Sequence, residues 1–393
     1  MDDLTHQDEE DARVLGRKLG LSRRQLLAAT TGMAAAAMFG LGTGHAHAHS
    51  GGAAAGLAAA KGGSNGVLFP PAKRGIILYT VRDAVGRNPL TSDLPSGFKE
   101  VLAELSRIGY KQIEFAGYTQ NANSAGGANM GTVAGAQQLR AWLDGNGLEA
   151  EGNHGSIPAT VNATTIADFD AQCQIANILG FDHIGTGMDP VAPGWVPGVG
   201  VYKSEWDATL DAWNFWGARA RSHGLKLYTH NHQHGYDFLI DSGPLDDAGR
   251  PTRSSGIRRL EYFLENTDPS GVYFELDIYW AHVAQHMFDT YTAPDGSSVS
   301  SVFDPAGLVA ANSKRFPLFH AKDGRLNAAN PLGYDIVPFG QGDIDFTTFF
   351  QRIGNKGYRN PMWEQDNAPS GAVPAQSLQN AASSYQALAA LRG

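Results

Sequence analysis

The chain has 393 residues, of which 42% are hydrophobic and 18% charged, a composition that excludes a disordered chain and leaves room for one large domain or two smaller ones. Its formal net charge of −9 gives no reason to expect nucleic acid or an anionic membrane surface as a partner. Cys173 is the one cysteine, which excludes an internal disulfide and a thiolate metal site, and its helical surroundings predict a role in core packing.

The N-terminal segment has the layout of an export signal. The paired arginines Arg23 and Arg24 open an uncharged stretch, rich in Ala and Gly, that runs to Leu41, and Ala-His-Ala at 46–48 is a small-x-small cleavage pattern. This layout predicts a twin-arginine signal peptide over residues 1–48, with the twin-arginine export machinery as partner and a periplasmic or extracellular location. The apolar run is short and weak for a membrane-spanning helix, so we expect no span in the mature protein; an uncleaved anchor is the alternative.

A flexible linker is expected after the signal. Residues 49–72 are rich in Gly, Ala and Ser and have no apolar pattern to pack. The folded domain is therefore expected over residues 73–393.

From there to the C-terminus, short apolar runs alternate with amphipathic helical patterns. The predicted strands are Gly75–Val81, Gln112–Phe115, Leu148–Asn153, His183–Thr186, Lys226–Thr229, Val272–Leu276, Pro317–Ala321 and Pro361–Glu364. The predicted helices are Phe98–Ile108, Ala136–Leu143, Ile166–Leu179, Trp206–Ser222, Ile257–Glu265, Ala306–Ser313, Phe346–Ile353 and Ala375–Leu391. Several of these helices end on a glycine that precedes the next strand, as expected where a left-handed residue stops a helix. Eight strand-then-helix units in one domain predict a (β/α)8 barrel, and the lack of a glycine-rich loop after the first strand argues against a dinucleotide-binding fold.

Polar and ionisable residues gather where the predicted strands end. In a barrel of this type the C-terminal strand ends form the mouth that carries the chemistry. The residues concerned are Glu114, Asn153, His154, His230, Asn231, His232, His234, Glu275, Asp277, His320, Lys322, Asp323, Glu364 and Asp366.

Four of these side chains predict a metal site. His230, Asp277, His320 and Glu364 come from the fifth to the eighth strand, which are neighbours around a barrel, and buried imidazoles and carboxylates are costly unless they are paired or bound to a cation. Their mixed N and O donors suit one divalent ion, Mn²⁺ first, with Zn²⁺, Co²⁺, Fe²⁺, Ni²⁺ or Mg²⁺ as alternatives. The alternative is a structural network of polar side chains that caps the barrel and holds no metal. His232, two residues beyond His230, would point to the same side and is the alternative ligand.

At these positions the sequence resembles the xylose-isomerase-like TIM barrels, which include sugar phosphate isomerases and epimerases, ketose 3-epimerases and inosose dehydratases. The resemblance runs from about Lys73 to the C-terminus and rests on residues 75–83 (GIILYTVRD), 228–232 (YTHNH), 276–280 (LDIYW), 320–323 (HAKD), 340–345 (GQGDID) and Glu364. It implies that His230, Asp277, His320 and Glu364 hold the metal. Many sugar epimerases of the family have a glutamate where this chain has His230, so a symmetric two-glutamate epimerisation is not implied.

Further roles at the mouth are expected as follows. Glu364 is the expected base, with His154, His232 or Lys322 as the group that protonates the substrate; for Lys322, pairing with Asp277 or Asp323 is the alternative. Substrate contacts are expected from Glu114, Asn231 and Trp280; a core role is the alternative for Trp280.

These expectations together favour an isomerase or epimerase that acts on an unphosphorylated sugar, keto-sugar or glycoside through an enediolate. The long loops at Thr119–Thr132, Pro190–Ser204, Asp241–Ser255 and Asp289–Ser301 are expected to shape the pocket. The alternatives are a metal-dependent dehydratase or lyase of keto-sugars or 3-keto-glycosides and a non-catalytic carbohydrate-binding barrel. An apurinic endonuclease is a further alternative, but the acidic net charge and the export signal argue against it. The sequence leaves a homo-oligomer open.

Overall fold

A computed structural model describes residues 66–125, 127–191, 199–354, 360–369 and 375–393. All of them belong to one structural unit, Ala59–Gly393. The predicted signal peptide and residues 49–65 of the predicted linker lie outside the described residues.

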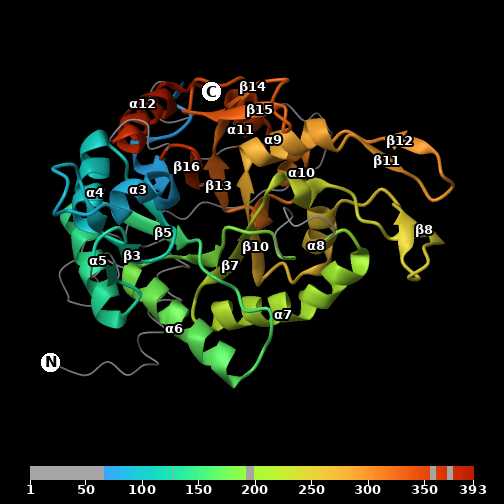
Figure 1. The fold of residues 1–393 in the computed structure, drawn as a ribbon, viewed down its shortest axis with the longest axis horizontal. Coiled ribbons are helices and arrows are strands. Elements are labelled where there is room, and N and C mark those ends of the chain that lie inside the picture. The colour runs from blue at the N-terminus through green and yellow to red at the C-terminus, as the bar shows by residue number, and fades with distance from the viewer. Residues whose placement is uncertain (1–65, 126, 192–198, 355–359, 370–374) are drawn as a thin grey trace, which may run out of the picture. The chain divides into compact units, whose positions relative to one another are not determined.

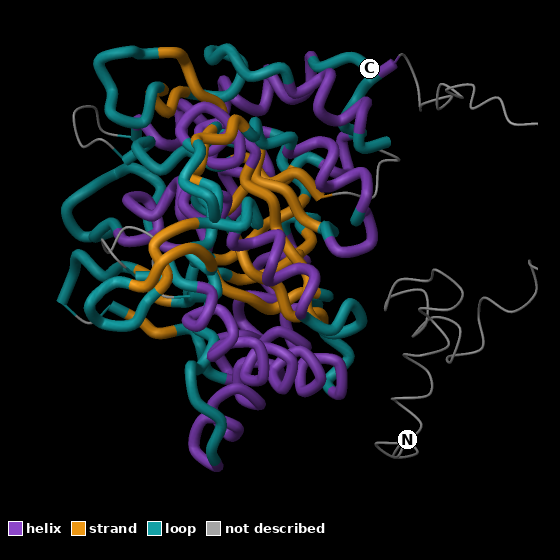
Figure 2. The backbone as a smooth tube through the Cα atoms, turned by 90° about the vertical axis from the view of Figure 1, so that its right-hand side faces the viewer, coloured by secondary structure: helices purple, strands orange, loops and turns teal. Residues whose placement is uncertain are grey.

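Eight parallel strands form the centre of this unit (Figures 1 and 2). Their hydrogen-bonded order is β5-β2-β1-β16-β13-β10-β7-β6. A parallel bridge between His154 and Gly185 joins the two outer strands, β5 and β6, and the Gly155 amide donates to the Gly185 carbonyl at 2.8 Å. The sheet therefore closes, which confirms the predicted (β/α)8 barrel.

The predicted strands all appear, seven of them within two residues of the expected bounds at both ends. They are β1 (Gly75–Ile77), β2 (Gln112–Phe115), β5 (Glu149–Asn153), β6 (His183–Thr186), β7 (Lys226–His230), β10 (Val272–Asp277), β13 (Leu318–Ala321) and β16 (Asn360–Trp363). The first strand was predicted too long, because the chain turns after Ile77 into the 3-10 helix η3 (Leu78–Val81) and helix α3 (Arg82–Gly86). Two contacts fix that turn above the barrel: Thr80 Oγ1 accepts from the Gln365 amide, and Arg82 donates to the Asp366 carbonyl.

All eight predicted helices are present. They are α4 (Gly97–Ile108), α5 (Val133–Gly145), α6 (Ala163–Leu179), α7 (Lys203–Ser222), α8 (Arg259–Asn266), α10 (Pro305–Ala311), α11 (Phe346–Arg352) and α12 (Gln376–Ala390). Local signals place their ends: Asn162 forms a capping box with Thr165 at the start of α6, and Gly180 takes the left-handed conformation after it. Cys173 of α6 is free and buried, as expected for a packing residue.

Helix α9 (Ile278–Met287) was not predicted. It begins directly after β10, because Asp277 ends the strand and caps the helix: its Oδ1 accepts from the Trp280 amide at 2.8 Å. Tyr279 and Trp280 are therefore helical residues rather than strand-end residues.

Three of the four predicted long loops fold into hairpins. They are β3–β4 (Thr119–Gln120 with Ala128–Asn129), β8–β9 (Ser242–Leu245 with Pro251–Arg253) and β11–β12 (Thr290–Thr292 with Ser298–Ser300). A fourth hairpin, β14–β15 (Asp323–Leu326 with Tyr334–Val337), follows β13. The loop Pro190–Ser204 lies partly outside the described residues.

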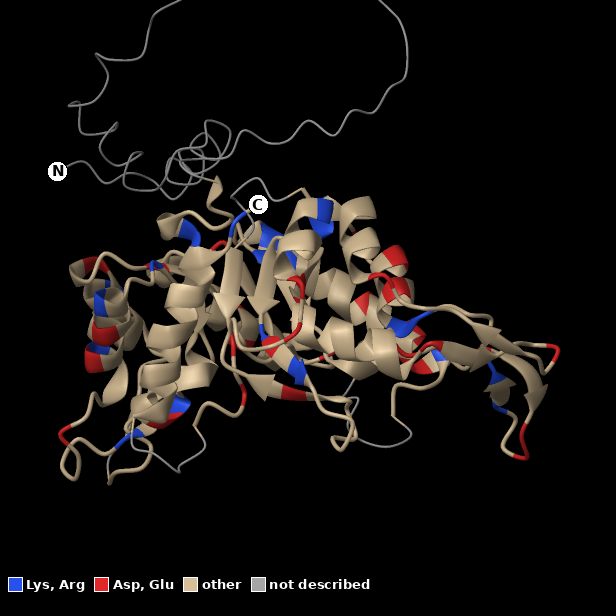
Figure 3. Cartoon of the chain, turned by 90° about the horizontal axis from the view of Figure 1, so that it is seen from above, with Lys and Arg blue, Asp and Glu red and all other residues tan. Residues whose placement is uncertain are grey.

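The described chain ends meet beside the barrel. Val67 forms a bridge with Arg392, and the Leu68 amide donates to the Leu391 carbonyl at 3.1 Å. Phe69, a residue of the predicted linker, is buried against Phe350. Charged residues of both signs lie on the outer helices and hairpins (Figure 3), and none of the described helices is long and apolar enough to span a bilayer.

Candidate metal centre and active site

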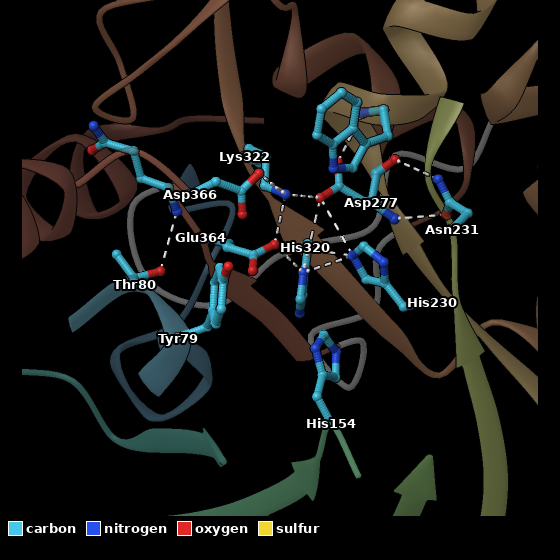
Figure 4. Close-up of polar contacts among 12 residues, drawn as sticks. Tyr79, Thr80, His154, His230, Asn231, Asp277, His320, Lys322, Glu364 and Asp366 are labelled. Carbon is cyan, nitrogen blue, oxygen red and sulfur yellow. Dashed lines mark hydrogen bonds and ion pairs between the residues drawn. The ribbon is translucent and has the colours of Figure 1, made fainter. Parts of the chain in front are cut away.

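The four predicted metal ligands meet at the C-terminal ends of neighbouring strands (Figure 4). His230 ends β7, Asp277 ends β10, His320 lies in β13, and Glu364 follows β16. Parallel pairing sets Asp277 beside His320 and Glu275 beside His230, which brings the side chains to one level of the mouth. All four are buried.

The spacing of their polar atoms fits a single cation. His230 Nε2 lies 3.0 Å from His320 Nδ1 and 3.5 Å from Asp277 Oδ2, and His320 Nδ1 lies 2.7 Å from Glu364 Oε2. Ligand atoms at about 2.1 Å from one metal ion lie about 3–4 Å from each other. The two separations from His230 Nε2 fall in this range, and the pair of His320 Nδ1 and Glu364 Oε2 is slightly closer. The four residues offer ligand atoms that all lie within 4.8 Å of one another.

The charge of the site also fits a cation. Asp277 and Glu364 are buried with Glu114 and Glu275, and among the described Lys and Arg side chains only Lys322 forms ion pairs with any of these four carboxylates. Buried carboxylates in excess of buried cations are unfavourable unless a further positive charge is supplied. Two imidazoles and two carboxylates make a donor set suited to Mn²⁺ and the other divalent transition metals.

Lys322 is the basic side chain of the centre. Its Nζ lies 2.8 Å from Asp277 Oδ2, 2.7 Å from Glu364 Oε2 and 3.1 Å from Asp366 Oδ2. Burial lowers the pKa of Lys322, but the carboxylates outweigh this effect and hold the pKa well above its usual value. Asp323, the other partner considered for Lys322, instead accepts from the amides of Gly324, Gly340 and Gly342.

Asn231 and Trp280 both contact Asp277. Asn231 is buried and uses both ends of its amide on the backbone of Asp277: Oδ1 accepts from the Asp277 N–H at 2.9 Å, and Nδ2 donates to its carbonyl at 3.3 Å. The Trp280 ring lies 5.1 Å from Lys322 Nζ, and its buried Nε1 has no hydrogen-bond partner among the described residues. Asn231 thus braces a ligand, whereas Trp280 keeps an unused donor beside the centre.

A second group of polar side chains lies next to the first and shares His320 with it. His320 Nε2 lies 2.9 Å from Glu114 Oε2 and 3.2 Å from Glu275 Oε2, and His154 Nε2 lies 2.7 Å from Glu275 Oε2. The Tyr228 hydroxyl donates to Glu114 Oε1. Glu114, His154, Glu275 and His320 also offer ligand atoms within 4.8 Å of one another.

Two members of this second group had no expected role. Glu275 stands two residues before Asp277, and a strand places such residues on the same face, so the period of two was the signal that could have found it. Tyr228 stands two residues before His230 in the same way. The distance from Glu114 to His320 depends on the register of strands far apart in sequence, which no single strand reveals.

Electrostatics separate the three histidines nearest the centre. Burial lowers the pKa of His230 to about 4, which keeps its imidazole neutral, as a ligand must be. Burial also lowers the pKa of His154, but Glu114 and Glu275 outweigh it and raise the pKa overall. For His320, Glu275 and Glu364 likewise outweigh burial and hold its pKa well above the usual value, so a cation that binds at Nδ1 would release a proton from this ring.

Glu364 and His232 complete the predicted set. Burial raises the pKa of Glu364, but Lys322 and His320 outweigh it, so the carboxyl group is ionised at neutral pH. His232 begins the short 3-10 helix η4 (Gln233–Tyr236), and its ring lies 5.1 Å from the His230 ring and 5.3 Å from the Trp280 ring. Burial and the positive charge around it hold the pKa of His232 well below the usual value.

Comparison with known proteins agrees with the barrel fold. The chain resembles two sugar phosphate isomerase/epimerase structures from Parabacteroides distasonis: one with 20% identity and a TM-score of 0.56 over 81% of this chain and 94% of that chain, the other with 18% and 0.55 over 80% and 96%. A "probable 3-DHS dehydratase" from Bacillus anthracis has 12% identity and a TM-score of 0.51 over 80% and 98%. At these identities the likeness shows the fold alone, and no curated protein matched the chain. The family model described as "Xylose isomerase-like TIM barrel" matches residues 102–386, and this chain therefore belongs to that family.

Proposed function

We propose that the protein is a metal-dependent isomerase or epimerase that acts on an unphosphorylated sugar, keto-sugar or glycoside. The observation that carries the proposal is the convergence of His230, Asp277, His320 and Glu364 on one buried point at the barrel mouth. A divalent ion held there, Mn²⁺ first, supplies Lewis-acid polarisation of a carbonyl group, which makes the neighbouring C–H bond more acidic. The membership of the family supports an isomerase or epimerase in general terms.

Glu364 is the proposed base. Lys322 and His320 hold it ionised, and the ionised form is the one that can accept a proton from carbon. The carboxylate is fixed by these contacts and needs no rearrangement to receive the proton.

His154 is the proposed group that returns a proton. Among the three candidates, Lys322 is engaged by three carboxylates, and His232 is held neutral. His154 has a raised pKa and a side chain that is 13% exposed, more than any of the four ligands. His154 stacks on the His320 ring with the ring centroids 5.1 Å apart, whereas Glu364 meets this ring at Nδ1, so the two groups reach the site from different directions.

The substrate is proposed to lack phosphate. Phosphate sites in proteins are built from Arg, Lys and backbone amides. Among the described residues, the side chains in contact with the two groups include no arginine, and Lys322 already faces carboxylates. Trp280, with its free indole N–H, is the proposed wall for a sugar face. Export by the twin-arginine route to the periplasm or exterior, where sugar phosphates are scarce, remains part of the proposal.

Solvent deuterium exchange tests the proposal directly. The Mn²⁺-loaded protein would be incubated in D₂O with a panel of ketoses and 3-keto-glycosides and followed by NMR. We expect deuterium at the carbon next to the carbonyl, together with an epimer or isomer, and we expect Glu364→Gln to lose the exchange.

Glu151→Gln is the matched control, because Glu151 is also a glutamate of the barrel, within β5, but contacts Gln112 and Asn360 at the N-terminal ends of β2 and β16. It should keep full exchange. Loss of a β-substituent in place of epimer formation would make the enzyme a lyase. No exchange with any compound would contradict the proposed activity and favour a non-catalytic carbohydrate-binding barrel.

A further inference from the structure

His320 is the residue that joins the two polar groups. Its Nδ1 faces the proposed metal centre, 2.7 Å from Glu364 Oε2, and its Nε2 faces the second group, between Glu114 and Glu275. The two nitrogens of this ring therefore face different groups of side chains. A neutral imidazole that binds a cation through one nitrogen carries its proton on the other, and that N–H needs an acceptor when it is buried.

The second group is built to be that acceptor. Glu114 Oε2 and Glu275 Oε2 lie within 2.9 and 3.2 Å of His320 Nε2. Each carboxylate has a further contact: the Tyr228 hydroxyl donates to Oε1 of Glu114, and His154 Nε2 contacts the same Oε2 of Glu275 that faces His320. Glu114, Glu275 and His320 are almost fully buried, so the ring has no water-exposed alternative for its N–H.

The geometry around His320 distinguishes this role from a second metal site. A second divalent ion between Glu114 and Glu275 would place two cations on one buried imidazole ring, where their charges repel. It would also have to take His320 Nε2 and so deprive that ring of its proton.

We propose that Glu114 and Glu275 are positioning residues that hold the Nε2–H of His320 and thereby present its Nδ1 to the metal ion. The inference rests on the proposed function, since it assigns a support to the same metal centre. It makes the second group a set of side chains that raises metal affinity, with Tyr228 and His154 fixing the two carboxylates.

Metal binding without substrate tests the inference. Isothermal titration of the full-length protein with Mn²⁺ should give one ion per chain. Glu114→Gln and Glu275→Gln should weaken binding by about 10–100-fold, because the substituted amide is a weaker acceptor and can turn its NH₂ toward the ring. Tyr228→Phe removes only the hydroxyl behind Glu114 and should give a smaller loss in the same direction.

Glu151→Gln is again the control, with unchanged affinity expected. The visible spectrum of the Co²⁺-loaded protein is the second measurement, since a shift of its bands in Glu114→Gln and Glu275→Gln reports a change at the ligand His320, which general destabilisation does not produce. Circular dichroism checks that each variant is folded. If a glutamine variant does not fold, Tyr228→Phe still tests the inference.

The possible outcomes distinguish the metal centre from the positioning role of Glu114 and Glu275. If the parent protein binds no metal, the proposed function fails. If it binds one ion and the two glutamine variants match it in affinity and Co²⁺ spectrum, the positioning role fails while the metal centre stands. Two ions in the parent, with one lost in Glu275→Gln, would replace the positioning role by a second metal site that uses Glu275 Oε1, which has no hydrogen-bond partner among the described residues.

Discussion

At the scale of single residues, Lys322 is buried and faces three carboxylates, those of Asp277, Glu364 and Asp366. Lys322→Met keeps the length of the side chain and removes its charge, leaving buried carboxylates unpaired. We expect the free energy of unfolding of the EDTA-treated protein to fall by about 3–5 kcal/mol. With Mn²⁺ the loss should be smaller, since the ion offsets part of the same negative charge.

Urea denaturation with EDTA and with Mn²⁺ measures both values. Lys203→Met is the control, because Lys203 forms an exposed pair with Asp207 one turn along α7 and should cost about 0.5 kcal/mol or less. An equal loss with and without Mn²⁺ would show that Lys322 and the ion do not share the same carboxylates.

Asn231 acts through the backbone rather than through a ligand atom. It holds both the N–H and the carbonyl of Asp277, so Asn231→Ala should let the Asp277 carboxylate shift. We expect Mn²⁺ affinity to fall by about 10-fold. Titration calorimetry gives the value, and Asn146→Ala, which removes an amide contact at the end of α5, should leave it unchanged. Equal affinities in the two variants would argue against the bracing role.

The ligand residues could be predicted because each stands at the end of an apolar strand, where burial of a polar or charged side chain is costly unless it is paired or bound to a cation. The contacts of Asn231 and Glu275 could not, because they depend on which residue of a neighbouring strand stands opposite. Asn231 was expected to contact substrate, yet both ends of its side-chain amide bond the backbone of Asp277 in β10. Pairing register is a property of two strands, and one strand's residues do not contain it.

At the scale of elements, the pairing of β6 with β7 depends on Gly185 of β6. A Cβ there would lie 2.3 Å from the Tyr228 carbonyl oxygen and 2.6 Å from its ring, and the backbone atom cannot rotate away. Gly185→Ala should therefore lower the free energy of unfolding by about 2–3 kcal/mol. Because Tyr228 braces Glu114, the variant should also weaken Mn²⁺ binding.

Gly145→Ala provides the matched control. Gly145 ends α5, and a Cβ there would meet nothing within 4 Å, so the change should be neutral or slightly stabilising by up to about 1 kcal/mol. Chemical denaturation of the two variants gives the comparison. A Gly185→Ala protein as stable as the parent would mean that β6 and β7 can separate at this point without cost.

The strands and most helices could be predicted because glycines and caps mark their ends and burial makes the strands uniformly apolar. Helix α9 could not, because Asp277 reads equally well as the last polar residue of a strand and as a helix cap. The hairpins within the long loops escaped for a related reason: their strands are two to four residues long, too short for an alternating pattern.

For the whole molecule, the N-terminal end of the barrel predicts a dependence of stability on pH. Glu151 lies there in contact with Gln112 and Asn360, and burial raises its pKa to about 7, against the opposing effect of Lys73. A raised pKa in the folded state means that the unfolded chain loses this proton first as the pH rises. The neutral form therefore favours folding at pH 4 and below, and this contribution is lost between pH 4.5 and about 7.

Glu151→Gln removes that titration. Relative to the variant, the parent should lose about 2–3 kcal/mol of unfolding free energy between pH 5 and pH 8, which corresponds to the change in pKa. Urea denaturation of both proteins at several pH values measures the difference, and Asp247→Asn, which changes an exposed carboxylate in the turn of the β8–β9 hairpin, should follow the parent throughout. Because Glu151 is far from the mouth, the same two variants should bind Mn²⁺ alike at pH 7; a pH-dependent gap in stability with unchanged metal affinity would show that the two ends of the barrel titrate independently.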